Sequence, residues 1–156
     1  MSTMQNDPWI VFNYEVEMFF LTRSEIPAHV PPKSTADQVI RNALVESSLL
    51  HTRILADILL CRGSAPDDIH LTHLLVSGES SPRLATSIAL LKSAWGDRNA
   101  EGSVCWTINK MLAHPTLWRT DRYDYGSVAN RVDPHITAAI EEIASLSNRP
   151  QLLTYQ

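Results

Sequence analysis

Five charged, amide or imidazole side chains lie in a largely apolar stretch between positions 42 and 60, namely Asn42, Glu46, His51, Arg53 and Asp57. A protein core excludes such side chains unless they are paired. At about 100° per residue on a helix, four of them form one narrow stripe, whereas His51 points about 140° away from Glu46. The stripe therefore brings two carboxylates and a guanidinium to one face of a helix.

This stripe allows two interpretations. If other helices cover it, Arg53 lies between Glu46 and Asp57 and neutralises both in a network that must be fully satisfied. Leucines interrupt the stripe and lysine is absent from it, which favours this buried interpretation. If the stripe faces solvent, Arg53 and Asp57 form an ordinary surface pair that needs no function.

The elements that position these residues are predicted to be helices. Three Asp-Pro or Ser-Pro pairs and a box-like Ser34 and Asp37 mark helix starts. Gly63 is placed to cap a helix that continues to Arg62. The helices are expected over residues 8–23, 34–62, 82–95, 103–114 and 134–147, the last beginning at Asp133-Pro134. The pattern predicts an all-α bundle of four to five helices around the long central helix 34–62, with helix 103–114 as its neighbour.

Composition and charge restrict the class of protein. The 156 residues suit one domain, 1–156, in which the first few residues and the tail 149–156 are expected to be peripheral. A net charge of -4 excludes a general polyanion-binding surface, so contact with nucleic acid needs a local basic patch. Cys61 and Cys105 lack CxxC spacing, and the chain has no membrane-length apolar run. We expect a cytoplasmic protein without disulfides or membrane contact.

A second polar group, formed by Asp67, Asp68, His70 and His73, has ligand types that suit a divalent metal ion. The surrounding segment is polar and rich in turn residues, which favours a solvated loop. Metal sites in helical bundles use Glu-x-x-His pairs, and the chain contains none. We therefore expect neither a metal ion nor a cofactor.

The run INKMLAHPTLWR adds Asn109, Lys110, His114 and Arg119 to the residues that could do chemistry. Together with NALVESSLLHTRILADIL, the order of motifs resembles the HEPN superfamily and its HEPN-like relatives in phage defence. Those proteins are helical bundles in which a long central helix bears acidic and basic residues and a later helix bears an Arg-x4-6-His motif. The resemblance extends over residues 9–147 in helix order.

Active members of that superfamily cleave RNA without a metal ion, usually across a homodimer. Arginine can hold a phosphate with two hydrogen bonds, and histidine can transfer a proton near neutral pH. The resemblance implies His114 as the acid and base, Asn109 and Lys110 as phosphate contacts, and Arg119 as a substitute cation. The supporting polar residues would be Asn42, Glu46, His51, Arg53 and Asp57.

The sequence departs from the motif at its arginine. Ile108 stands directly before Asn109, where the resemblance places the arginine. The literal Arg-x5-His match, Arg23 to His29, ends in a proline-rich loop and is interpreted as chance. This departure predicts weak or absent metal-independent ribonuclease activity, with any residual cleavage depending on His114.

Two functional classes stay open. One is an RNA-directed HEPN-like protein of prokaryotic stress or phage defence, acting as a weak or degenerate endoribonuclease. Trp106 and Trp118 near the fourth helix then predict a homodimer through that face, because aromatic residues are enriched in interface cores. The alternative is a non-catalytic helical interaction or scaffold module whose polar network only fixes packing. A bundle that binds a small molecule or a metal is a weaker third option.

Overall fold

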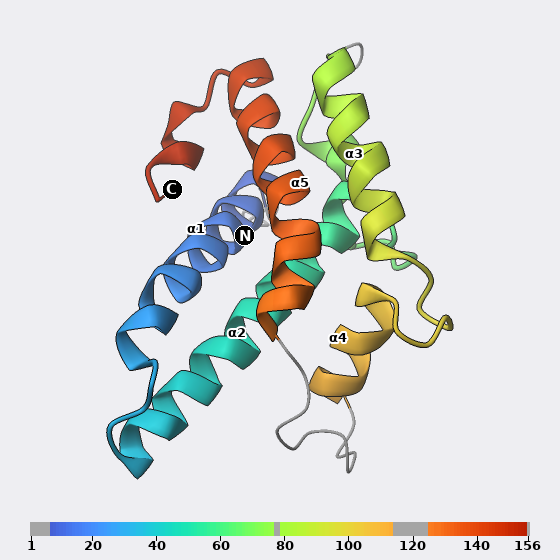
Figure 1. Cartoon of the computed structure of the whole chain (residues 1–156). Coiled ribbons are helices and arrows are strands. Elements are labelled where there is room, and N and C mark those ends of the chain that lie inside the picture. The colour runs from blue at the N-terminus through green and yellow to red at the C-terminus, as the bar shows by residue number, and fades with distance from the viewer. Residues whose placement is uncertain (1–6, 77–78, 114–124, 156) are drawn as a thin grey trace, which may run out of the picture.

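The computed structural model describes residues 7–76, 79–113 and 125–155. Within these ranges the chain forms five α-helices and no strand, so the predicted all-α bundle is confirmed (Figure 1). The helices are α1 (Pro8–Glu25), α2 (Thr35–Leu59), α3 (Pro82–Trp95), α4 (Val104–Ala113) and α5 (Tyr125–Leu146). None of the described helices is long and apolar enough to cross a membrane.

Three helices begin at the predicted side-chain caps. The Asp7 carboxylate accepts a hydrogen bond from the backbone N–H two residues on, at 3.0 Å. Ser34 and Ser81 accept from backbone N–H groups three residues on, at 3.1 Å and 3.0 Å. These oxygens satisfy donors that the first turn of a helix leaves without an intrahelical partner. Because each cap involves only neighbours in the chain, the local sequence was enough to predict it.

The predicted end of the second helix is wrong. Helix α2 ends at Leu59, and Cys61 rather than Gly63 adopts the left-handed conformation, with φ of 52°. Backbone bonds from Cys61 N to Ile58 O and from Arg62 N to Asp57 O close the helix in the Schellman pattern. Gly63 instead allows the Asp68 side chain to approach closely, because a Cβ atom at position 63 would lie 2.4 Å from that side chain.

The predicted start of the last helix is also wrong, since α5 begins well before Asp133 and Pro134 lies inside it. A proline in a helix interior costs about 3 kcal/mol, so packing must offset it. Val128 and Val132, in the added turns, are buried in the core. Asp133 serves as an ion-pair partner instead of a cap, because Arg23 Nη2 of α1 donates to its Oδ1 at 2.8 Å.

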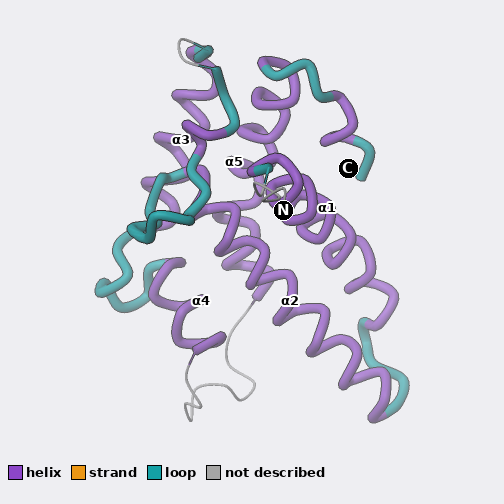
Figure 2. The backbone as a smooth tube through the Cα atoms, turned by 180° about the vertical axis from the view of Figure 1, so that it is seen from behind, coloured by secondary structure: helices purple, strands orange, loops and turns teal. Residues whose placement is uncertain are grey.

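Helix α2 lies at the centre of the bundle. Helices α1 and α2 form an antiparallel hairpin, α3 lies beside α5, and α4 packs against α2 and α3 (Figures 1 and 2). The predicted adjacency of the second and fourth helices is therefore confirmed. The largest fully buried side chains come from all five helices and include Phe12, Phe19, Leu55, Leu59, Leu91, Trp95, Ile108, Ile136 and Ile140.

Part of the tail that follows α5 packs against the helices. A 3-10 turn at Pro150–Leu153 contacts α5 and α1. Leu152 is buried against the core. The Arg149 guanidinium lies 4.1 Å from the ring centroid of Trp9, a cation–π contact that joins the tail to α1. One buried leucine and one stacked arginine hold this segment in place. Two such contacts are too few to produce a periodic pattern in the sequence.

Candidate functional site

The polar stripe of α2, formed by Asn42, Glu46, Arg53 and Asp57, is not the buried network that its spacing favoured. Asn42 and Glu46 are exposed, and Asn42 accepts a hydrogen bond from Gln38 at 2.7 Å. Arg53 Nε lies 3.8 Å from Asp57 Oδ2, with 39% and 42% of the two side chains exposed. Arg53 and Asp57 line a cavity with Cys105 and Asn109 of α4, and both side chains remain partly in contact with water.

Of the five α2 residues that the sequence analysis singled out, His51 is the buried one. Its Nδ1 donates to Glu15 Oε2 of α1 at 2.6 Å, and only 6% and 8% of the two side chains are exposed. The Tyr14 ring meets the imidazole edge-on, with 5.8 Å between ring centroids. This pair joins α1 to α2 inside the hairpin, so His51 does not contribute to a site on the stripe. The sequence signal for this pair is Glu15, a carboxylate within an otherwise apolar helix.

Helix α4 sends its polar residues in different directions. Ile108 is fully buried, whereas Asn109, one residue on, is partly exposed beside α2. Lys110 Nζ lies 5.7 Å from the centroid of the Trp106 ring, in a cation–π contact along the helix. The predicted site residues His114 and Arg119 lie outside the described residues, as does Trp118.

A small cavity collects the polar side chains of α2 and α4 that the sequence singled out. We call it the arginine cavity; it has a volume of about 190 Å³. Its lining residues are Arg53, Asp57 and Arg62 around the end of α2, Trp95 and Arg98 around the end of α3, and Cys105 and Asn109 of α4. The structure thus brings together Arg53, Asp57 and Asn109, which the sequence analysis named as candidates. It adds four residues that the sequence analysis did not name as candidates.

The lining of the arginine cavity is rich in hydrogen-bond donors. Three guanidinium groups face a single carboxylate, which leaves an excess of positive charge. Trp95 is 1% exposed, and its indole Nε1 has no hydrogen-bond partner among the described residues. Asn109 Nδ2 and Arg62 Nη1 donate only to the weak acceptor Cys105 Sγ, at 3.5 Å and 3.7 Å. Three guanidinium groups around one carboxylate, with donors whose acceptor is a thiol, favour an anionic ligand.

Asp57 is the one acid of this cavity, and its environment disfavours its charge. Burial raises the pKa of the Asp57 carboxyl above its usual range, and Asp68 adds to the increase. The guanidinium groups of Arg53, Arg62 and Arg98 lower the same pKa without cancelling the effect of burial. The protein therefore keeps a carboxylate where an uncharged side chain would suit the folded state better, a common property of functional sites.

We expect Asp57→Asn to stabilise the protein at neutral pH. Because the folded-state pKa of Asp57 is raised, the folded wild type loses stability as pH rises from the ordinary value of 3.8 through the raised one. The gain should be under about 1 kcal/mol, since much of the side chain faces water. Urea unfolding of both proteins at several pH values would measure it. The stability difference should vanish in acid; a difference that does not change with pH would contradict this explanation.

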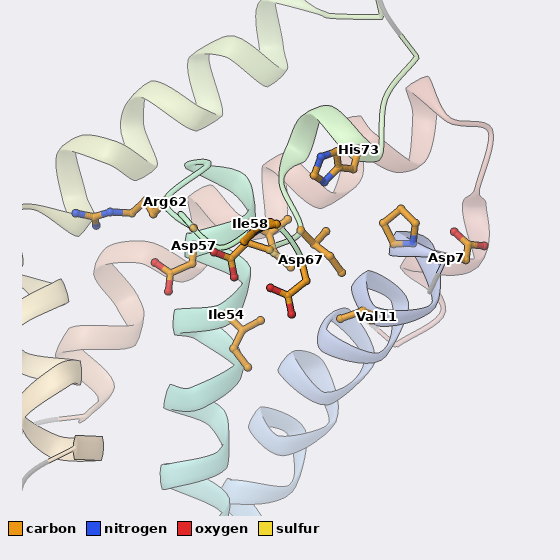
Figure 3. A pocket seen from close by; sticks show the side chains of 13 residues that line it. Asp7, Val11, Ile54, Asp57, Ile58, Arg62, Asp67 and His73 are labelled. Atoms are coloured by element: carbon orange, nitrogen blue, oxygen red, sulfur yellow. The ribbon is translucent and has the colours of Figure 1, made fainter. Parts of the chain in front are cut away.

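A larger groove adjoins the arginine cavity on the side of α1 (Figure 3). It has a volume of about 1160 Å³ and shares Asp57 and Arg62 with the cavity. Val11 of α1 and Ile54 of α2 lie on its facing walls, whereas Asp57 and Arg62 turn away from α1 (Figure 3). Carboxylates predominate around it, because Asp7, Asp57, Asp67 and Asp68 all line it. We call it the acid-lined groove.

The predicted cluster of Asp67, Asp68, His70 and His73 mostly shapes its own loop. Asp68 Oδ2 accepts from a backbone N–H within the loop at 2.6 Å, and His73 Nδ1 accepts from His70 N at 3.1 Å. The two imidazole rings stack with 5.5 Å between centroids. Among the described residues, no group of three or more His, Cys, Asp or Glu side chains could hold a metal ion.

Sequence reasoning missed four residues of the arginine cavity. Arg62 lies just past the end of α2, and Arg98 lies in the loop between α3 and α4, so neither belongs to a periodic pattern. Trp95 and Cys105 have the character of core residues, and only their place beside the arginines gives them another role. The glycines around Arg98 indicated a break between helices but not the direction of its side chain.

Comparisons of the chain with protein-family models, with curated proteins and with solved structures return no match. The arrangement of this chain's own residues is therefore what bears on its function.

Proposed function

We propose that this protein binds RNA through its backbone phosphate, with the arginine cavity as the point of contact, as an RNA-directed helical protein of HEPN-like type. The observation that carries the proposal is the convergence of Arg53, Arg62 and Arg98 on a cavity that Asp57 lines as the single carboxylate. Guanidinium groups suit phosphate because they donate two parallel hydrogen bonds.

The overall negative charge of the chain is compatible with such a site. Non-specific binding across a protein's surface needs a broad positive field, which a net charge of -4 does not provide. A local cluster of three arginines can still bind a phosphate, because each guanidinium can donate charge-assisted hydrogen bonds to it. This protein should therefore contact few phosphates, and its binding should depend weakly on salt compared with strongly basic RNA-binding proteins.

Cleavage of the bound RNA is the catalytic part of the proposal. His114 directly follows α4, the helix that supplies Asn109 to the arginine cavity. We assign His114 as the acid and base of a weak, metal-independent cleavage. Lys110 lies over the Trp106 ring and does not line the cavity, so no contact supports a role for Lys110 in binding phosphate there. Stress or phage defence and a homodimer through the α4 face belong to the same proposal.

We expect Arg53→Gln to weaken the binding of a short single-stranded RNA at least about tenfold, since a hydrogen bond to a charged group contributes about 1.5–3 kcal/mol. Isothermal titration calorimetry in EDTA would measure the affinity. Arg83→Gln is the matched control, because Arg83 lies at the opposite end of α3 and pairs with Glu142 at 3.5 Å. RNA binding that Arg53→Gln leaves unchanged would disprove the proposed site.

The catalytic part is tested separately by incubating structured and single-stranded RNA with the protein in EDTA. Wild type should cleave slowly or not at all, and His114→Ala should remove whatever cleavage occurs. Robust cleavage that His114→Ala does not affect would contradict the assigned role. Binding without cleavage would leave an RNA-binding protein that lacks the catalytic step.

One observation favours the alternative of a non-catalytic interaction module. Two polar groups join helices away from the arginine cavity. The buried pair of Glu15 and His51 joins α1 to α2, and the partly buried Arg23 joins α1 to Thr52 of α2 and to Asp133 of α5. Networks of this kind fix the packing of helices without any chemistry. If neither RNA binding nor cleavage is observed, this alternative accounts for the buried polar residues.

A further inference from the structure

We propose that the arginine cavity accepts a terminal phosphate of RNA, a dianionic phosphomonoester, rather than an internal phosphodiester. The inference rests on the proposed function and specifies which phosphate of the RNA occupies the site. Four features support it: the charge of the cavity, its hydrogen-bond donors, its size and the acid-lined groove beside it.

The charge of the lining matches a dianion. Three guanidinium groups and one carboxylate leave a net charge near two positive. A phosphomonoester carries about -1.5 to -2 at pH 7, whereas a phosphodiester carries a single negative charge. A diester would leave part of the cationic lining uncompensated, so the monoester is the better electrostatic partner.

The donors of the lining also suit a group with three free oxygens. A monoester presents three unesterified oxygens and a diester only two. Arg53 and Arg62 approach from the α2 side, and Arg98 comes from the loop after α3. Asn109 of α4, whose Nδ2 donates to the weak acceptor Cys105 Sγ at 3.5 Å, adds an amide donor to the lining. The third oxygen of a monoester gives one more acceptor to this crowded set of donors.

The cavity is too small for a nucleotide with both its neighbours. Its 190 Å³ correspond to roughly six water molecules at about 30 Å³ each. This volume suits a phosphate with a few bound waters, or a phosphate with part of its ribose. A base must therefore stay outside the cavity. The cavity can bind the end of an RNA chain, but it cannot recognise the base sequence of the RNA.

The acid-lined groove disfavours an RNA chain that runs through the cavity. An internal phosphate has a nucleotide on both sides, and each brings another negative charge. On the α1 side the backbone would meet Asp7, Asp67 and Asp68, whose carboxylates repel it. An end phosphate avoids this repulsion, because the chain leaves the cavity in one direction only.

The test compares short single-stranded RNAs that differ only at their ends. Isothermal titration calorimetry in EDTA would measure unlabelled RNA with a 5′-phosphate, with a 3′-phosphate, and with hydroxyl groups at both ends. A hydroxyl-ended RNA extended by two nucleotides controls for charge, because it adds as much negative charge as one monoester. We expect at least one phosphorylated RNA to bind about tenfold more tightly than both hydroxyl-ended RNAs.

Variants locate the effect. Arg98→Gln should abolish the preference for a terminal phosphate, and Arg83→Gln should preserve it. Circular dichroism and thermal unfolding would establish that both variants are folded. Inorganic phosphate should compete with the phosphorylated RNA in wild type and lose this effect in Arg98→Gln.

The outcomes separate the inference from the proposed function. Equal binding of phosphorylated and hydroxyl-ended RNA, weakened by Arg53→Gln, would overturn the inference and leave the proposed function standing. Failure of every RNA to bind would overturn both. Binding of a phosphoserine peptide without any binding of RNA would also overturn both, because the ligand would then be a protein. A terminal-phosphate preference that survives Arg98→Gln would place the site elsewhere and disprove the inference.

Discussion

Replacement of Ile108 with arginine is expected to cost at least about 4 kcal/mol of the free energy of unfolding, a loss seen when an unpaired charge is buried. Ile108 is fully buried in α4, which packs against α2 and α3. A guanidinium cannot lose its proton to escape this environment. Since domains are stable by about 5–15 kcal/mol, much of the variant protein would be unfolded or aggregated.

The expected result bears on the HEPN resemblance as well as on stability. The resemblance placed the missing arginine at position 108. In the structure, the side chain at this position is buried in the core. Asn109, the next residue, lines the arginine cavity instead. Arg53, Arg62 and Arg98, which belong to other elements, line the same cavity.

Urea unfolding followed by circular dichroism would measure the loss, with Ile108→Leu as the matched control. The leucine variant conserves volume and should lose under about 1.5 kcal/mol. Asn109→Arg, which adds a guanidinium on the cavity side, should be tolerated far better than Ile108→Arg. A soluble Ile108→Arg protein with nearly wild-type stability would show that position 108 does not face the core.

Replacement of His51 with leucine is expected to cost about 3–5 kcal/mol, the usual penalty for breaking a buried pair and stranding one charge. Glu15 would keep only 8% of its side chain exposed and would lose the partner 2.6 Å away. Leucine is close to histidine in volume, so the loss would report the unpaired carboxylate rather than a cavity. The Tyr14 ring contact would also be lost.

The double variant Glu15→Leu with His51→Leu separates pairing from packing. Because two well-packed apolar side chains can replace a buried pair at little cost, the double variant should be more stable than His51→Leu alone. Thermal and urea unfolding of the wild type, both single variants and the double variant complete the cycle. Additive losses would mean that Glu15 and His51 do not interact, contrary to the structure.

Sequence alone determined the features that depend on neighbours in the chain. The caps at Asp7, Ser34 and Ser81 were predicted because a side chain and the N–H groups that it accepts from lie within three residues. The helical class follows from apolar periodicity, which the buried faces of the helices confirm. The predicted start of α5 was wrong because distant contacts prevailed there. Buried Val128 and Val132 extend α5 through Pro134, and Asp133 pairs with Arg23 of α1.

Only the tertiary structure decided which polar residues meet. The spacing of the α2 stripe was the same whether or not another helix covered it, so the sequence could not distinguish solvent from core. The packing of α1 onto α2 buried His51 with Glu15, two residues that share no local pattern. The turn after α3 and the placement of α4 brought Arg98, Trp95 and Asn109 to Arg53. Such convergence depends on side-chain directions from several elements at once, and those directions are set by packing rather than by spacing along one chain segment.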